Sequence, residues 1–90
     1  MEVGGVIDSG AGNLFKYRGA DFGDANKVVK QGTYRGGLQN SNTPNNTQYG
    51  ILCVFKADVY IFQLFFDPSI FYGRMSVDSG NSWLEWRNLL

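Results

Sequence analysis

The sequence has no histidine and only one cysteine, Cys53. Histidine is the commonest general base and the commonest metal ligand in proteins, so its absence removes both candidates at once. A single cysteine cannot close a disulfide within the chain. Because Cys53 lies in the apolar run GILCVF, we expect it to be a small buried core residue.

Charge is also scarce, and neither sign dominates. Eight Lys and Arg residues balance eight Asp and Glu residues, so the formal net charge is zero. The basic residues are scattered as single positions, and none of them forms a run that could follow a nucleic-acid backbone. The longest apolar stretch, VYIFQLFF, is far too short to cross a bilayer. The composition therefore predicts no nucleic-acid partner, no membrane insertion, no metal and no cofactor.

What the chain does have is aromatic side chains: seven Phe, five Tyr and two Trp among 90 residues. These residues can fill a hydrophobic core, because each buries a large area. A chain of this length forms one domain, and a domain of this size is only marginally stable alone. The glycine-rich beginning predicts a flexible arm or linker over residues 1–20, followed by a knob-like β domain over residues 21–90.

From Tyr49 onward, apolar residues recur with period two, which is typical of β-strands. A helix is expected before them, within residues 23–31, with Asp24 as its cap and Gly32 at its end. Short turns separate the later strands, which predicts an antiparallel meander. The fold class is therefore mainly β: a small antiparallel meander or sandwich-like knob with one short helix. The expected strands cover residues 33–37, 49–56, 59–66, 70–77 and 82–89, with a further short strand within 14–22.

The two central strands are apolar on both faces, although a half-exposed sheet would show one polar face. Either the helix and the N-terminal segment cover the second face, or a partner chain does. We expect self-association, because an uncovered apolar face of this size typically marks an interface. The residues expected in this contact are Tyr60, Phe62, Leu64, Phe66 and Phe71.

Trp83 and Trp86 lie three residues apart in the closing segment GNSWLEWRNLL. This spacing is near one helical turn, but the preceding turn DSGN and the alternation before it favour a strand. On a strand, Trp86 and Leu84 point into the core, and Trp83 shares the other face with Glu85 and Arg87. We therefore expect Trp86 to be buried and Trp83 to be partly exposed, where its ring can stack on arginine or on a sugar.

Several short motifs within residues 21–90 resemble a known family. They are GTY, YGILCV, a strand with QLF, then FYGR, and the closing SWLEWRNL. In this order they resemble the pyocin-knob type of domain found near the ends of phage tail fibres and R-type bacteriocin fibres. The closing tryptophan pair with Arg87 is the most specific part. Met75 makes its strand more apolar than is usual in the family, and residues 1–20 match nothing in it.

This resemblance implies a non-catalytic β knob, often carried on a trimeric fibre, whose role is contact with a bacterial surface and commonly with glycans. It would place the protein in the virion, in a phage or prophage tail that acts at the bacterial cell surface. The alternative is a purely structural or oligomerisation module of a tail fibre or bacterial surface protein, without a ligand. The family has no fixed ligand-binding motif, so the resemblance identifies no binding residue.

The polar loop over residues 38–48 is the longest irregular segment, and such loops on rigid β scaffolds often carry recognition. Its amide side chains can donate and accept hydrogen bonds to sugar hydroxyls, and two tyrosines flank it. The alternative is a solvated connector that binds nothing. The candidate ligand-binding residues, with the closing segment included, are Tyr34, Asn42, Asn45, Asn46, Tyr49, Trp83 and Arg87.

One stretch resembles part of an enzyme: GVIDSGAGNLF, residues 5–15, is similar to the opening of glutamine amidotransferases. Those enzymes need a Cys–His–Glu arrangement, and this chain has no histidine. Among the carboxylates, Asp67 and Asp78 lie in predicted turns, and Glu85 is placed to form a surface ion pair with Arg74. None of them forms an acid–base pair, so we expect no catalytic residue.

Overall fold

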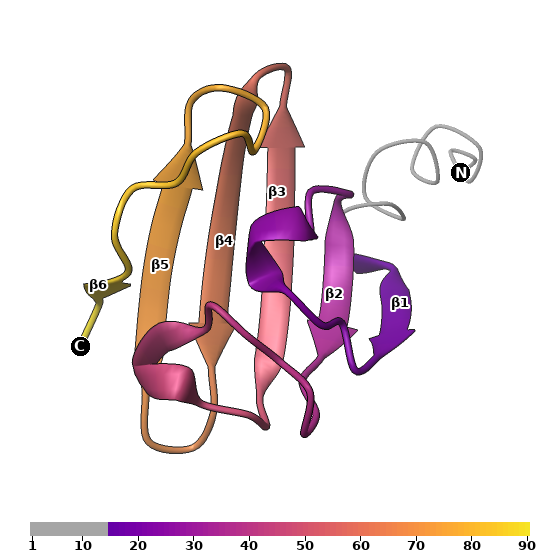
Figure 1. The fold of residues 1–90 in the computed structure, drawn as a ribbon, viewed down its shortest axis with the longest axis vertical. Coiled ribbons are helices and arrows are strands. Elements are labelled where there is room, and N and C mark those ends of the chain that lie inside the picture. The colour runs from indigo at the N-terminus through magenta and orange to yellow at the C-terminus, as the bar shows by residue number, and fades with distance from the viewer. Residues whose placement is uncertain (1–14) are drawn as a thin grey trace, which may run out of the picture.

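The computed structural model describes residues 15–90, which form a single six-stranded sheet (Figure 1). The strands follow one another in chain order across the sheet; the first pair is parallel and all later pairs are antiparallel. The predicted mainly β fold is confirmed. The strands are β1 (Tyr17–Ala20), β2 (Gly32–Arg35), β3 (Ile51–Ala57), β4 (Tyr60–Phe66), β5 (Phe71–Ser76) and β6 (Arg87–Asn88).

The sheet begins with the short strand that was expected within residues 14–22. Strand β1 lies within the segment 1–20 that was predicted to be an arm, and it pairs with β2 through Tyr17 and Thr33. The first part of that arm, residues 1–14, lies outside the described residues. Between residues 17 and 90, the helical structure consists of two short 3-10 turns, η2 (Ala25–Lys27) and η3 (Pro44–Asn46).

The three long strands β3, β4 and β5 are joined by short turns whose chemistry is local. Ala57 pairs with Tyr60, which leaves Asp58 and Val59 as the turn, one residue later than predicted. Asp58 has a φ of 58°, a left-handed conformation that aspartate tolerates better than most residues. The turn after β4 is held by Asp67, whose carboxylate accepts the backbone N–H groups of residues 69 and 70 and whose pKa is lowered by these bonds.

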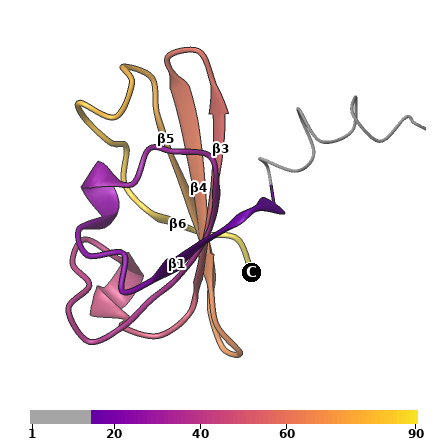
Figure 2. The ribbon, with the colours of Figure 1, turned by 90° about the vertical axis from the view of Figure 1, so that its right-hand side faces the viewer.

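One face of the sheet, which we call the covered face, lies under η2, the loop that carries η3, and the segment between β5 and β6 (Figure 2). The predicted division of the central strands into two faces is confirmed, since alternate residues of β3 and β4 are buried. Phe22 meets Phe65 edge-on, with 6.4 Å between their ring centres. The buried core under these segments consists of Val28, Leu52, Val54, Ile61 and Phe65.

The short helix predicted within residues 23–31 forms only as the single 3-10 turn η2. Its beginning was predicted correctly: the Asp24 carboxylate accepts the N–H of Asn26 at 2.9 Å. The carbonyls of Ala25 and Val28, however, accept the side-chain amide of Gln63 at 2.8 and 2.9 Å. These bonds tie the turn to the sheet, and the β-branched residues that follow favour helix less than most. No helix between residues 15 and 90 has the length and apolar character to cross a bilayer.

The strand predicted over residues 82–89 is wrong for most of its length, because only β6 (Arg87–Asn88) forms. After β5 the chain leaves the sheet and passes over the covered face (Figure 2). The Asp78 carboxylate holds this departure by accepting the N–H and the hydroxyl of Ser82, and these bonds lower the pKa of Asp78. Strand alternation therefore does not apply, and Leu84, predicted to join Trp86 in the core, is 62% exposed.

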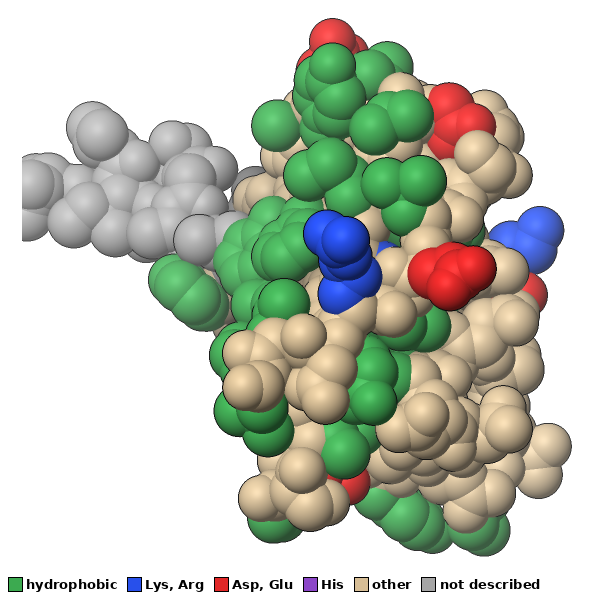
Figure 3. Space-filling model, turned by 90° about the vertical axis from the view of Figure 1, so that its left-hand side faces the viewer, with side chains coloured by type: hydrophobic (Ala, Val, Ile, Leu, Met, Phe, Trp, Pro, Cys, Tyr) green, Lys and Arg blue, Asp and Glu red, His purple; other side chains and the backbone are tan. Residues whose placement is uncertain are grey.

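The opposite face of the sheet, which we call the open face, carries apolar side chains with no element of residues 15–90 packed across it (Figure 2). Phe55 stacks on Phe62 at 6.2 Å, and Phe66 meets Phe71 edge-on at 5.8 Å. In a view from the edge of the sheet, hydrophobic side chains gather on the side of the open face, at the left of the picture (Figure 3). Cys53, predicted to be buried, is only half-buried here, where burial raises the pKa of its thiol.

The bonds of Gln63 give a test of how the covered face is held. Gln63→Leu keeps the size of the side chain but removes its amide group. Two loop carbonyls and the Nε of Arg74 then have no partners, so the free energy of unfolding should fall by about 3 kcal/mol. Urea denaturation would measure the change. Gln48→Leu, at an exposed glutamine of the loop, should shift the free energy of unfolding by no more than about 0.5 kcal/mol. Equal effects of the two substitutions would contradict this account.

Candidate ligand-binding site

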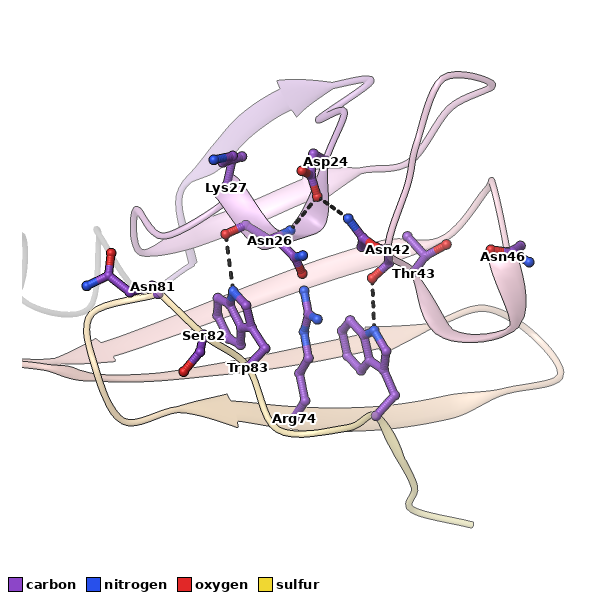
Figure 4. Close-up of a pocket in the computed structure, with 12 residues that line it drawn as sticks. Asp24, Asn26, Lys27, Asn42, Thr43, Asn46, Arg74, Asn81, Ser82 and Trp83 are labelled. Carbon is purple, nitrogen blue, oxygen red and sulfur yellow. Dashed lines mark hydrogen bonds between the residues drawn. The ribbon is translucent and has the colours of Figure 1, made fainter.

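A polar cavity of about 540 Å³ opens on the covered face, between η2, the loop that carries η3, and the segment after β5 (Figure 4). Three parts of the chain that are far apart in sequence therefore meet at one place. The lining combines amides, hydroxyls, two indole rings and three charged groups. Besides Gly80, the lining residues are Asp24, Asn26, Lys27, Asn42, Thr43, Asn46, Arg74, Asn81, Ser82, Trp83 and Trp86.

Arg74 forms the centre of this polar cavity. It lies opposite Gln63 on the neighbouring strand, is only 7% exposed, and donates from Nε to Oε1 of Gln63 at 2.8 Å. Its guanidinium carbon lies over both indole rings, 4.3 Å from the centre of the Trp83 ring and 4.4 Å from the centre of the Trp86 ring. Two aromatic faces partly compensate the cation for its lost hydration.

Burial has a measurable consequence for the charge of Arg74. Desolvation lowers the pKa of Arg74 to about 10, although the negative charge of Asp24 acts in the opposite direction. The side chain is therefore still a cation at neutral pH. A buried cation that is not paired with a carboxylate is costly, and this makes the surroundings of Arg74 the most informative part of the cavity.

The two tryptophans attach the segment after β5 to two different loops. Trp83 donates from its indole N–H to the backbone carbonyl of Asn26 at 3.1 Å, and Trp86 donates to the carbonyl of Asn42 at 2.9 Å. Both rings are partly buried and pack against the core. Trp83 lies at the boundary of the core as expected, but Trp86, expected inside the core, is also only partly buried, and the two rings pack against the same guanidinium of Arg74.

Asp24 fixes the loops on the far side of the polar cavity. Its Oδ1 accepts the side-chain amide of Asn42 at 2.7 Å and the N–H of Asn26 at 2.9 Å (Figure 4). The hydrogen bond from Asn42 is the main reason that the pKa of Asp24 is lowered. The carboxylate is thus committed to two donors of its own loops rather than to Arg74.

Two buried polar atoms beside the cavity have no hydrogen-bond partner within residues 15–90: Nη2 of Arg74 and Oδ1 of Asn26. Figure 4 shows the tip of Arg74 directed toward the side chain of Asn26. One is a donor and the other an acceptor, so the base of the cavity holds unused capacity of both kinds. Together with the amide groups and the indoles, this arrangement is suited to binding a polar ligand.

The structure brings together three of the residues that the sequence proposed for ligand binding, namely Asn42, Asn46 and Trp83. The other four lie elsewhere. Tyr34 donates its hydroxyl to the carbonyl of Lys30 at 2.6 Å, and Asn45 donates to the hydroxyl of Tyr72 at 3.1 Å. Two of the seven candidates are exposed outside the polar cavity: Tyr49 and Arg87.

The asparagines of the loop have a second, structural role. Asn42, Asn45 and Asn46 adopt φ values of 60°, 56° and 57°, in the left-handed region. Asparagine tolerates this conformation better than other residues with a Cβ, apart from aspartate. The amide-rich composition that suggested sugar contacts is therefore explained in part by backbone geometry.

Sequence reasoning missed Arg74, Asp24 and Asn26 as cavity residues. The expected ion pair between Arg74 and Glu85 is wrong, since Arg74 bonds to Gln63 and Glu85 is exposed. A signal was present: Gln63 and Arg74 are polar residues at inward positions of apolar strands. Buried polar residues require partners, so their position predicts a polar structure on the covered face.

Within residues 15–90, no three His, Cys, Asp or Glu side chains lie together in a way that could hold a metal ion. The groups that meet at the polar cavity are amides, hydroxyls, indoles and charged side chains. This set can position a ligand by hydrogen bonds and ring contacts.

Comparison with known proteins provides no relative from which a function could be transferred. No family model matches the chain, and no curated protein or solved structure matches it either. The likeness to pyocin-knob domains thus rests on short motifs, and function has to be inferred from the geometry of the site.

The equivalent positions of the two indoles predict equivalent energies. Trp83→Ala and Trp86→Ala should each lower the free energy of unfolding by about 2 kcal/mol, because each removes one indole hydrogen bond and one ring contact with the buried cation. Chemical denaturation followed by circular dichroism would measure both. Tyr49→Ala, at an exposed aromatic residue, should cost clearly less. A large cost for only one tryptophan would contradict the equivalence.

Proposed function

We propose that this domain is a non-catalytic recognition module that binds carbohydrate in the polar cavity, as the tip domain of a phage or prophage tail fibre acting at the bacterial cell surface. The observation that carries the proposal is the polar cavity itself, with two indole rings, amide groups and a buried cation at one place. Carbohydrate ligands present both apolar ring faces and many hydroxyls, and this lining offers partners for each. The tail-fibre setting rests on the motif resemblance to pyocin-knob domains.

The geometry of the lining supports a sugar more than a wholly apolar ligand. Asn46 and Asn81 are exposed at the cavity, where their amides reach solvent and can both donate and accept. The indoles are anchored by their N–H groups, so their rings are held in place before a ligand arrives. Preorganised groups lose less entropy on binding, which is important for a weak ligand.

The carbohydrate proposal is tested by titrating the isotope-labelled full chain with surface polysaccharide fragments. The expected result is a change in the indole N–H signals of Trp83 and Trp86, together with the amide signals of Asn42 and Asn46. The chain has only these two tryptophans, so any indole N–H signal belongs to one of them. Shifts confined to Tyr34 or Tyr49 would locate binding elsewhere and contradict the proposed site.

A second candidate function is favoured by a different observation, the open face. This face has a hollow of about 510 Å³ whose lining is mainly apolar and includes Cys53, Phe55, Leu64, Phe66 and Phe71. We propose that copies of the chain associate through it, and the resemblance to fibre domains favours a trimer. A domain with this face alone would serve as an assembly module without a ligand. The two functions are compatible, because the faces lie on opposite sides of the sheet.

Self-association is tested by placing a charge in the open face. Phe62→Glu should convert an assembled species to a monomer in sedimentation velocity, because a buried carboxylate without a partner strongly disfavours the interface. Leu84→Glu is the matched control, since Leu84 is an exposed apolar residue on the segment over the other face. It should leave the assembly unchanged. A wild-type chain that is monomeric at every concentration would contradict the assembly proposal and leave the carbohydrate proposal standing.

A further inference from the structure

Among the residues that the structure describes, the cation at the polar cavity has no anionic hydrogen-bond partner. Within residues 15–90, the Arg74 side chain forms one hydrogen bond, to the neutral amide of Gln63, and its Nη2 has no hydrogen-bond partner. The indole rings stabilise its charge by their faces but accept no hydrogen bond in its plane. A guanidinium in such a setting is best satisfied by a carboxylate, which accepts in that plane and carries the opposite charge.

The charge balance of the lining points the same way. Three charged residues line the cavity: Lys27 and Arg74 are cations, and Asp24 is an anion, which leaves an excess of one positive charge. The carboxylate of Asp24 already accepts from the N–H of Asn26 and the amide of Asn42. The charge of Asp24 is thus partly compensated by donors from its own loops. The uncompensated charge at the base of the cavity is positive.

We infer that the polar cavity selects an acidic saccharide, with the carboxylate of a uronic acid seated against the guanidinium of Arg74. The inference rests on the proposed carbohydrate-binding function and adds the class of sugar. A uronic acid carries its carboxylate on a pyranose ring, so one residue can meet the cation, while its hydroxyls meet the amide of Asn46 and its ring lies against an indole. Lys27, exposed at the cavity, adds a second favourable charge.

Asn26 controls access to the unpaired nitrogen. Nη2 of Arg74 is buried, and the tip of the Arg74 side chain is directed toward the side chain of Asn26 (Figure 4). Oδ1 of Asn26 accepts no hydrogen bond, so no bond to this oxygen opposes rotation of the amide when an acid group arrives. The same geometry provides an isosteric test, because Asn26→Asp would place a permanent carboxylate in front of Arg74.

The experiment compares trigalacturonic acid with its fully methyl-esterified form, which keeps the sugar rings and removes the negative charge. Fluorescence of the full chain reports on the cavity directly, because both of its tryptophans line it. The acid should bind about tenfold more tightly than the ester, the scale of one charge-assisted hydrogen-bonded pair. Added salt should weaken binding of the acid and leave binding of the ester unchanged.

Three variants identify the cation responsible. Asn26→Asp should raise the melting temperature and lower the affinity for the acid about tenfold, because the new carboxylate occupies Arg74. Lys27→Ala should lower the affinity for the acid about twofold to threefold, and Lys56→Ala, an equal charge change away from the cavity, should not. Arg74→Met should remove the preference for the acid; if that variant does not fold, Asn26→Asp still decides the question.

Each outcome has a distinct meaning. Equal affinity for the acid and the ester would overturn the choice of acidic sugars and leave the carbohydrate function standing. A preference for the acid that survives Asn26→Asp would also overturn the inference, because the carboxylate of the sugar would then be recognised at another site. A chain that binds neither form, with no change in tryptophan fluorescence, would end both the inference and the proposed use of this cavity.

Discussion

Gln63 and Arg74 face each other across β4 and β5, within a sheet face that is otherwise mainly apolar. The structures that cover this face have little regular hydrogen bonding of their own, so their backbone groups need partners on the sheet. The side-chain NH2 of Gln63 donates to two carbonyls of the η2 region, and its Oε1 accepts from Arg74. Arg74 in turn packs against both tryptophans of the segment after β5. The polar pair Gln63 and Arg74 thus attaches both the η2 region and the segment after β5 to the sheet.

This arrangement makes the candidate site inseparable from the fold. Within residues 15–90, only five buried apolar residues form the core cluster, which is little for a domain of this length. The tryptophans and Arg74 extend that core to the cavity and also form part of its lining. A substitution at the site therefore changes stability as well as binding, and the two can be separated only with isosteric changes or with changes at the rim.

The strands were predictable because period-two patterning is a local property that pairing reinforces. The faces of β3 and β4 follow directly from alternation, and the structure agrees residue by residue. The same rule failed over residues 82–89, because the carboxylate of Asp78 binds Ser82 and directs the chain off the sheet. The helix is reduced to a single 3-10 turn for a related reason, since carbonyls in and just after η2 are bonded to Gln63. Both differences from the prediction come from long-range or side-chain hydrogen bonds, which the periodicity of the sequence cannot predict.

The site itself was only partly predictable, for the same physical reason. The loop asparagines and Trp83 were recognisable by residue type, but Arg74 gains its role from the register of β5 against β4 and from the return of the chain over the covered face. Its inward position on an apolar strand was the available signal. Polar residues at inward positions are costly unless satisfied, so Gln63 and Arg74 together indicate that something polar must lie above them.

The two faces of the sheet are held by different interactions, so the domain has two chemically different sides. The covered face holds its polar groups by fixed bonds, which suits discrimination between ligands, whereas the open face presents phenylalanine pairs without directional bonds. Apolar contact is tolerant of geometry and scales with area, which suits assembly of copies. If copies do associate through the open face, the stability of each domain becomes linked to its concentration, and several cavities are held on one particle. Weak binding at one cavity would then add to binding at the next, so the apolar face would raise the effective affinity of a site with which it shares no contact.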